Sequence, residues 1–132
     1  MRRYAYTHQS QRFLFVFPVS CFYERVAARC DDATVLPRLD LMGLAGLLLE
    51  ADGAVAVDTG LGHLAAALDV PTVSLYGPTS TQLVGAYGRN QVHIQSPVGS
   101  ADTDDPLAMM SAISPAQVWE ALQPLVAATD SA

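Results

Sequence analysis

Basic residues are scarce in this sequence, and charge of either sign is low. Charged side chains make up 15% of the 132 residues, and seven basic residues stand against thirteen acidic ones, which gives a net charge of −6. With so few positive charges the chain lacks a broad phosphate-attracting surface, so we expect no nucleic-acid partner. Hydrophobic residues make up 51% of the chain, enough for the core of one domain and too many for a disordered acidic tail.

Metal-ligating residues are few and scattered. Cys21 and Cys30 lie nine residues apart, a spacing that matches no zinc-binding pattern, and no other cysteine is present. We interpret them as reduced, partly buried thiols. His8, His63 and His93 are too far apart in sequence to suggest a metal site. We therefore expect neither a metal nor another cofactor.

Long apolar runs are also absent, since no segment approaches the roughly 20 apolar residues that span a bilayer. Near the amino terminus the short run Phe13–Phe17 follows three arginines and precedes Pro18-Val19-Ser20-Cys21. This order has a faint similarity to a lipoprotein export signal. Because the run is short and aromatic and Pro18 breaks it early, a buried parallel strand is the favoured interpretation.

What the sequence does contain is an alternation of strand and helix patterns. It predicts an α/β fold, a three-layer Rossmann-like domain with a parallel sheet and flanking helices. We place this domain at residues 33–127, after a strand and short helix within 1–32 and before a tail at 128–132. The expected strands are Phe13–Phe17, Ala33–Leu36, Ala54–Val57, Thr72–Tyr76 and Val92–Gln95, and the expected helices are Phe22–Cys30, Leu41–Ala51, Leu61–Leu68 and Pro115–Ala127.

Capping residues mark two of the helix starts. Asp40 precedes the second expected helix and is a favoured N-cap residue. Ser114, Pro115 and Gln117 form a capping-box pattern at the start of the last helix. Pro124 lies inside that helix, and we expect it to bend or shorten the helix.

Two strand ends carry polar residues, at the edge where parallel α/β sheets bind ligands. The strand that ends at Val57 is followed at once by Asp58-Thr59-Gly60 and a helix. The first backbone N–H groups of such a helix have no internal partner, and with the helix dipole they attract an anion without lysine or arginine. Thr59 can add a hydroxyl donor, and the lack of side chains at Gly60 and Gly62 lets a diphosphate approach the backbone.

Two residues of this stretch have alternative roles. Asp58 either faces a sugar and accepts hydrogen bonds from its hydroxyls, or caps the helix. His63 either donates to a phosphate oxygen or is a partly buried histidine satisfied by a backbone carbonyl. The neighbouring motif favours the first role for His63, whereas these residues alone leave both roles open for Asp58.

The second strand end follows Tyr76. Gly77-Pro78 forces a sharp exit from the sheet, and Thr79 and Ser80 supply hydroxyls beside the first site. Taken alone, this is an ordinary strand-to-loop turn. The competing signatures G-x-G-x-x-G, G-x-x-x-x-G-K-[ST] and G-x-S-x-G are absent from the sequence.

In combination, residues 57–68, 70–72 and 75–79 resemble the signature of glycosyltransferase family 9, the heptosyltransferases. The family has a D-[TS]-G-L-x-H-[LV]-A-A-A core followed by a Y-G-[PA]-T turn. Thr59 and the stretch 85–88 resemble the heptosyltransferase I branch. The resemblance covers about residues 33–126.

The resemblance implies one half of a GT-B fold, in which two Rossmann-like domains face each other across a cleft. The carboxyl-terminal half binds ADP-heptose, and the enzyme transfers the heptose, with inversion and without a metal, to the Kdo of the lipopolysaccharide inner core of Gram-negative bacteria. It also implies roles for individual residues. Thr59 and Gly60 would contact the diphosphate, Asp58 would hold heptose hydroxyls, and Leu61 and His63 would line the donor, with Gly62, Gly77, Pro78 and Thr79 as supporting residues.

The sequence departs from the family pattern in two ways. Family members are longer, and the part without a counterpart here is the amino-terminal domain, which binds the lipid A–Kdo acceptor and carries the presumed catalytic base. We therefore identify no catalytic residue in this chain and expect a truncated product. Residues 1–32 match the family poorly.

The resemblance predicts a cytoplasmic location, with peripheral association with the inner membrane as an option. Two alternatives remain beside the donor domain: an inactive remnant or nucleotide-binding module that keeps the fold, and an unrelated small α/β nucleotide-binding protein.

Overall fold

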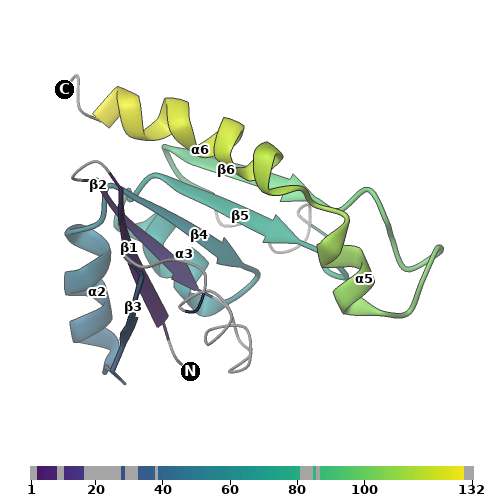
Figure 1. The fold of residues 1–132 in the computed structure, drawn as a ribbon, viewed down its shortest axis with the longest axis horizontal. Coiled ribbons are helices and arrows are strands. Elements are labelled where there is room, and N and C mark those ends of the chain that lie inside the picture. The colour runs from purple at the N-terminus through teal and green to yellow at the C-terminus, as the bar shows by residue number, and fades with distance from the viewer. Residues whose placement is uncertain are drawn as a thin grey trace.

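Six strands form one sheet, in the order β3-β1-β2-β4-β5-β6 (Figure 1). The computed structural model describes residues 3–8, 11–16, 28, 33–37, 39–80, 85 and 87–129. The strands are β1 (Arg3–His8), β2 (Gln11–Val16), β3 (Ala33–Leu36), β4 (Gly53–Val57), β5 (Thr72–Tyr76) and β6 (Gln91–Gln95). The helices are α2 (Leu41–Leu49), α3 (Gly60–Ala67), α5 (Pro106–Ser111) and α6 (Pro115–Thr129).

The predicted parallel sheet is confirmed for four of these strands. β2, β4, β5 and β6 run parallel, and β2 contains most of the apolar run that we expected to be a buried strand. β1, which the sequence patterns did not predict, is antiparallel to both β2 and β3, so the sheet has a mixed edge. The helix expected at Phe22–Cys30 lies outside the described residues, except for residue 28.

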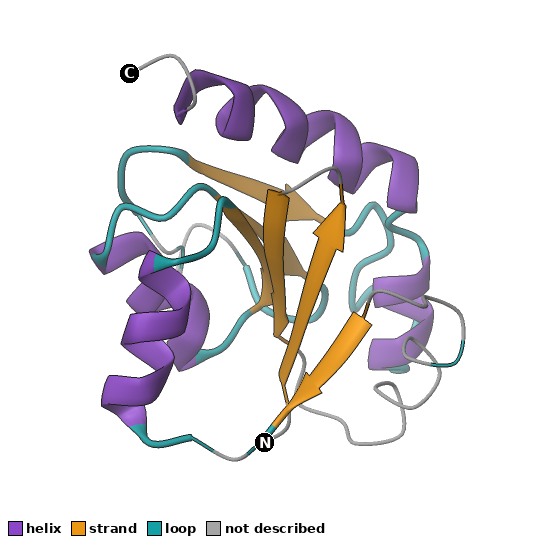
Figure 2. Ribbon diagram, turned by 60° about the vertical axis from the view of Figure 1, so that its left-hand side comes forward, coloured by secondary structure: helices purple, strands orange, loops and turns teal. Residues whose placement is uncertain are grey.

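Helices cover both faces of the sheet, and alternate residues of its strands face two separate cores (Figure 2). On one face α2 and α3 pack against the sheet around Ala54 and Ala56 of β4. On the other face α6 packs through Leu122 and Val126 against a cluster that includes Val55 of β4. This division is what a three-layer α/β domain requires.

The cap predictions are confirmed by hydrogen bonds. The Asp40 carboxylate accepts from the amide of Gly43 at 2.8 Å. Ser114 and Gln117 cap each other reciprocally, at 3.2 and 3.3 Å. Of the two expected effects of Pro124, a shortened last helix is wrong, since α6 continues to Thr129, and a bend in the helix stays a prediction. A proline removes one intrahelical hydrogen bond, and the packing of α6 on the sheet holds the helix together across that position.

The short helix α5 was not predicted. Asp105 caps it by accepting from the amide of Leu107 at 3.0 Å, and Pro106 occupies its first turn. These are ordinary start signals, but a helix of six residues leaves no periodic apolar pattern to find. Within the described part of the chain, no helix has the length and apolar character needed to cross a membrane.

Candidate functional site

The site begins at the junction between β4 and α3. β4 is a strand of small apolar residues and ends at Val57, and α3 begins at Gly60, so only two residues connect them. Val57 is paired in register with Leu75 of β5. The carboxyl ends of β4 and β5 therefore lie side by side at one edge of the sheet, where ligands of such folds bind.

The first two backbone amides of α3 make no hydrogen bond with the described residues. The amides of Gly62 and His63 both reach back to the carbonyl of Thr59, at 3.0 and 3.4 Å. Those of Gly60 and Leu61 have no hydrogen-bond acceptor among the described residues. A Cβ atom at Gly60 would meet no other atom within 4 Å, and Gly60 is exposed. Among the described residues, therefore, nothing occupies these two amides, and the anion site that the sequence predicts here stays a prediction.

Thr59, not Asp58, occupies the N-cap position of α3. Its backbone is extended, with φ −147° and ψ 160°, and its side chain makes no capping hydrogen bond. The capping interpretation of Asp58 is therefore wrong. Asp58 is half-buried, and its carboxylate has no hydrogen bond or ion pair with any described residue. Its two carboxylate oxygens can therefore accept hydrogen bonds from a ligand.

The hydroxyl of Thr59 is a further unused donor. Its Oγ1 atom is covered and has no hydrogen-bond partner among the described groups. A covered hydroxyl without a partner costs free energy, about 1–3 kcal/mol in general.

The remaining residues of the first turn of α3 divide between the sheet and solvent. Leu61 is 7% exposed and packs in the core, so only its backbone can meet a ligand. A Cβ at Gly62 would lie 3.5 Å from that of Ala56, at ordinary van der Waals distance, so Gly62 faces the sheet. His63 is exposed, so its interpretation as a partly buried histidine is wrong.

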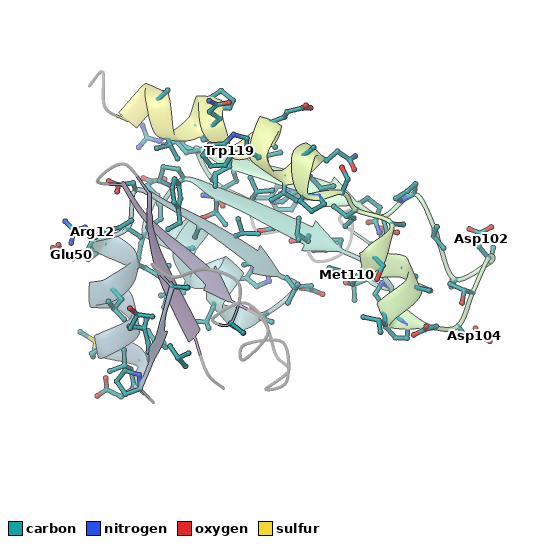
Figure 3. All side chains as sticks on the ribbon, viewed as in Figure 1. Arg12, Glu50, Asp102, Asp104, Met110 and Trp119 are labelled. Atoms are coloured by element: carbon teal, nitrogen blue, oxygen red, sulfur yellow. The ribbon has the colours of Figure 1, made fainter. Side chains whose placement is uncertain are left out.

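The second strand end lies beside this turn and is held by residues far along the chain. The Nε2 atom of Gln95 donates to the carbonyls of Tyr76 and Gly77, at 3.3 and 3.0 Å. Met110, which Figure 3 labels on α5, lies against Gly77. Pro78 and Thr79 follow and are exposed. Sequence reasoning missed Gln95 and Met110 because no local motif connects them to the turn.

Charged and metal-binding groups contribute little here. The chain contains no lysine, and its seven basic residues are all arginines. Among the described residues, no three histidine, cysteine, aspartate or glutamate side chains converge as a metal site would need. Cys21 and Cys30 lie outside the described residues.

Comparisons with known proteins converge on one family. Residues 20–110 match glycosyltransferase family 9 (heptosyltransferase). Lipopolysaccharide heptosyltransferase 1 of Pseudomonas aeruginosa is 64% identical over 72 residues, which are 54% of this chain and 20% of that protein. The Salmonella typhimurium protein of the same name is 50% identical over 74 residues, 56% of this chain and 23% of that protein. This chain therefore spans about a fifth of the length of the curated relatives it matches.

Two solved structures of a heptosyltransferase are also similar to this chain. Escherichia coli heptosyltransferase WaaC with ADP superposes with a TM-score of 0.55 at 45% identity, over 57% of this chain and 23% of that one. The same enzyme with ADP-2-deoxy-2-fluoro heptose gives a TM-score of 0.50 at 43% identity, over 57% and 22%.

Proposed function

The chain belongs to glycosyltransferase family 9, and on that premise we propose that it is the donor-binding part of a heptosyltransferase of type I. In this role it binds ADP-heptose, whose heptose is then transferred to the Kdo of the lipopolysaccharide inner core. Two observations support the proposal. The relatives it matches are named lipopolysaccharide heptosyltransferase 1, and the solved neighbour binds ADP and an ADP-heptose analogue.

The observation that carries the proposal is the set of unused donors at the start of α3. The amides of Gly60 and Leu61 and the hydroxyl of Thr59 have no partners among the described residues. A diphosphate supplies acceptor oxygens for several donors at once, and the helix dipole adds attraction. This arrangement explains how an acidic chain without lysine can bind a dianionic group.

The sugar end of the donor fits the neighbouring side chains. The carboxylate of Asp58 is half-buried and accepts hydrogen bonds only, so it suits heptose hydroxyls better than phosphate. His63 is exposed on the first turn of α3 and would lie against the donor. Pro78 and Thr79, beyond the end of β5, would border the same space.

This geometry also suits the chemistry of transfer. When the bond from heptose to ADP breaks, negative charge grows on the diphosphate, and fixed N–H donors stabilise that charge as it develops. No metal is needed for this step in the proposal. The lipid A–Kdo acceptor and the catalytic base would be held by regions of the relatives that this chain does not cover. We place the reaction in the cytoplasm, at the inner face of the inner membrane.

Calorimetry with ADP tests the binding site. ADP and ADP-heptose should bind the folded chain, and AMP should bind more weakly because it lacks one of the two phosphates. Absence of heat at millimolar ADP, with circular dichroism showing a folded protein, would contradict the assignment.

A second candidate, a nucleotide-binding module without transferase activity, is favoured by the short coverage of the relatives, about a fifth of their length. Mixing the chain with a separately produced acceptor domain of the Pseudomonas aeruginosa relative discriminates the two. Heptose transfer in the mixture supports the transferase, whereas ADP binding without transfer supports the module.

A further inference from the structure

The exit of β5 is held by the end of β6. The side-chain amide of Gln95 donates to the carbonyls of Tyr76 and Gly77, at 3.3 and 3.0 Å, and the backbone amide of Ser96 donates to the carbonyl of Tyr76 at 2.7 Å. These two carbonyl oxygens fix the orientation of the Gln95 side-chain amide. In the flipped orientation the oxygen of that amide would face both carbonyl oxygens and be repelled by them. The nitrogen of Gln95 must therefore face the turn.

The same turn is held from α5. The hydroxyl of Ser96 is buried and lies 2.7 Å from the carbonyl of Met109, the residue before Met110. A Cβ atom at Gly77 would lie 2.9 Å from the sulfur of Met110, closer than such contacts occur. The backbone of Gly77 thus accepts a hydrogen bond from Gln95 and lies against the side chain of Met110.

The position of this turn matters for the residues that follow it. β4 and β5 are neighbours in parallel register, so the turn after β5 lies next to Asp58 and Thr59. Gly77 is the last buried residue, and Pro78 and Thr79 extend into solvent beyond it. A displacement of the Gly77 carbonyl therefore moves Thr79 relative to the first turn of α3.

We propose that Gln95 is a positioning residue for the donor site, because its amide fixes the Gly77 carbonyl and thereby sets the place of the Pro78–Thr79 turn beside the start of α3. The inference rests on the proposed function, since it assumes that the donor binds at that helix. Gln95 does not touch the donor itself, and its effect passes through the backbone of the turn.

Gln91 provides a matched control in the same strand. Its side-chain amide also donates to two backbone carbonyls, those of Val70 at 2.8 Å and Arg89 at 3.1 Å. These carbonyls lie at the opposite end of β5, away from the start of α3. Gln91→Leu and Gln95→Leu remove the same kind of hydrogen bonds from the same strand without changing charge.

The test compares ADP binding by calorimetry and the backbone amide signals of Gly77 and Thr79 in nitrogen-15 spectra. Gln95→Leu should weaken ADP binding about 3- to 10-fold, the value of one or two hydrogen bonds, and shift both signals. Gln91→Leu should stay within about twofold of the unaltered chain and leave both signals in place. Gln95→Ala, which adds no bulk, should behave as Gln95→Leu does.

Two results would overturn the inference while leaving the proposed function intact: unaltered ADP binding in both Gln95 variants, or an equal loss in Gln91→Leu. If the unaltered, folded chain fails to bind ADP, the proposed function fails first and the inference falls with it. The nitrogen-15 signals then still show whether Gln95 fixes the turn.

Discussion

The two helices on one face of the sheet, α2 and α3, begin in opposite ways. α2 is capped from within, because the Asp40 carboxylate accepts from the amide of Gly43 at 2.8 Å. α3 has Thr59 at the corresponding position, with no capping hydrogen bond. Both helix starts attract negative charge. The protein supplies that charge for α2 through the Asp40 cap, whereas no described side chain caps the start of α3.

The outer surfaces of the two helices differ as well. α2 consists entirely of apolar residues and glycine, and Leu41, Met42 and Leu49 are 65, 76 and 62% exposed. α3 exposes Gly60 and His63 instead. Under the proposed function the donor binds at the start of α3, and α2 takes no part in binding it. Substitutions in α2 should then change stability without changing ADP affinity, and substitutions of the exposed residues Gly60 and His63 should do the reverse.

The largest effect is expected in the core-facing side of α2. Leu48 is 1% exposed, so Leu48→Ala should lower the free energy of unfolding by about 3 kcal/mol through lost burial and a cavity. Urea denaturation measures this change. The neighbouring Leu49→Ala should change it by less than about 0.5 kcal/mol, because that side chain is exposed. ADP affinity of the folded protein should not change in either variant. A large loss of ADP affinity in both variants would contradict the separation of roles between α2 and α3.

The next largest effect is expected at the open start of α3. Gly60→Val should weaken ADP binding by about 100-fold or more, because a branched side chain would occupy the approach to the free amides. A Cβ at Gly60 meets no atom within 4 Å, so the fold should tolerate the change.

Gly46→Val in α2 is the matched control for that variant, since a Cβ there also meets nothing within 4 Å. Calorimetry should show unaltered ADP binding in this variant. Equal losses in the two valine variants would mean that the phosphate does not bind at the start of α3.

His63→Ala should have a smaller effect on binding. We expect ADP-heptose affinity to fall by about 10-fold, the value of one hydrogen bond to a charged group. The melting temperature should stay the same, because His63 is exposed. A marked drop in melting temperature would indicate a structural role in place of the proposed one.

The smallest effects test the two caps directly. Asp40→Ala should lower the free energy of unfolding by about 1 kcal/mol, the usual value of an N-cap, and leave ADP binding unchanged. Thr59→Ala should do the reverse, because no capping bond is lost and a donor for the diphosphate is removed. Urea denaturation measures the free energy of unfolding of both variants, and calorimetry measures their ADP affinity. A stability loss in Thr59→Ala equal to that in Asp40→Ala would remove the contrast between the helices.

Much of the fold was predictable where strong local signals coincide. β5 has the predicted bounds, Thr72–Tyr76, because Pro71 and Gly77-Pro78 end the apolar run on both sides. The reciprocal cap of Ser114 and Gln117 also formed as predicted. β1 escaped prediction because its place depends on pairing with β2 and β3, which no local pattern encodes.

The candidate site was predictable in place but not in detail. The sequence named Asp58 as a possible cap of α3, whereas Thr59 takes that position. The choice depends on where β4 ends in its register with β5, which fixes the backbone of the two connecting residues.

By itself, the sequence determined that a buried strand of small residues is followed at once by Asp58-Thr59-Gly60 and a helix, and that this junction carries the motif of glycosyltransferase family 9. These are properties of neighbouring residues, and local propensity is enough to set them. Only the tertiary structure decided that Leu61 points into the core, that the Thr59 hydroxyl has no partner and that Gln95 holds the turn after β5. Such contacts exist only once β4, β5 and β6 pair, because they join groups that are distant along the chain.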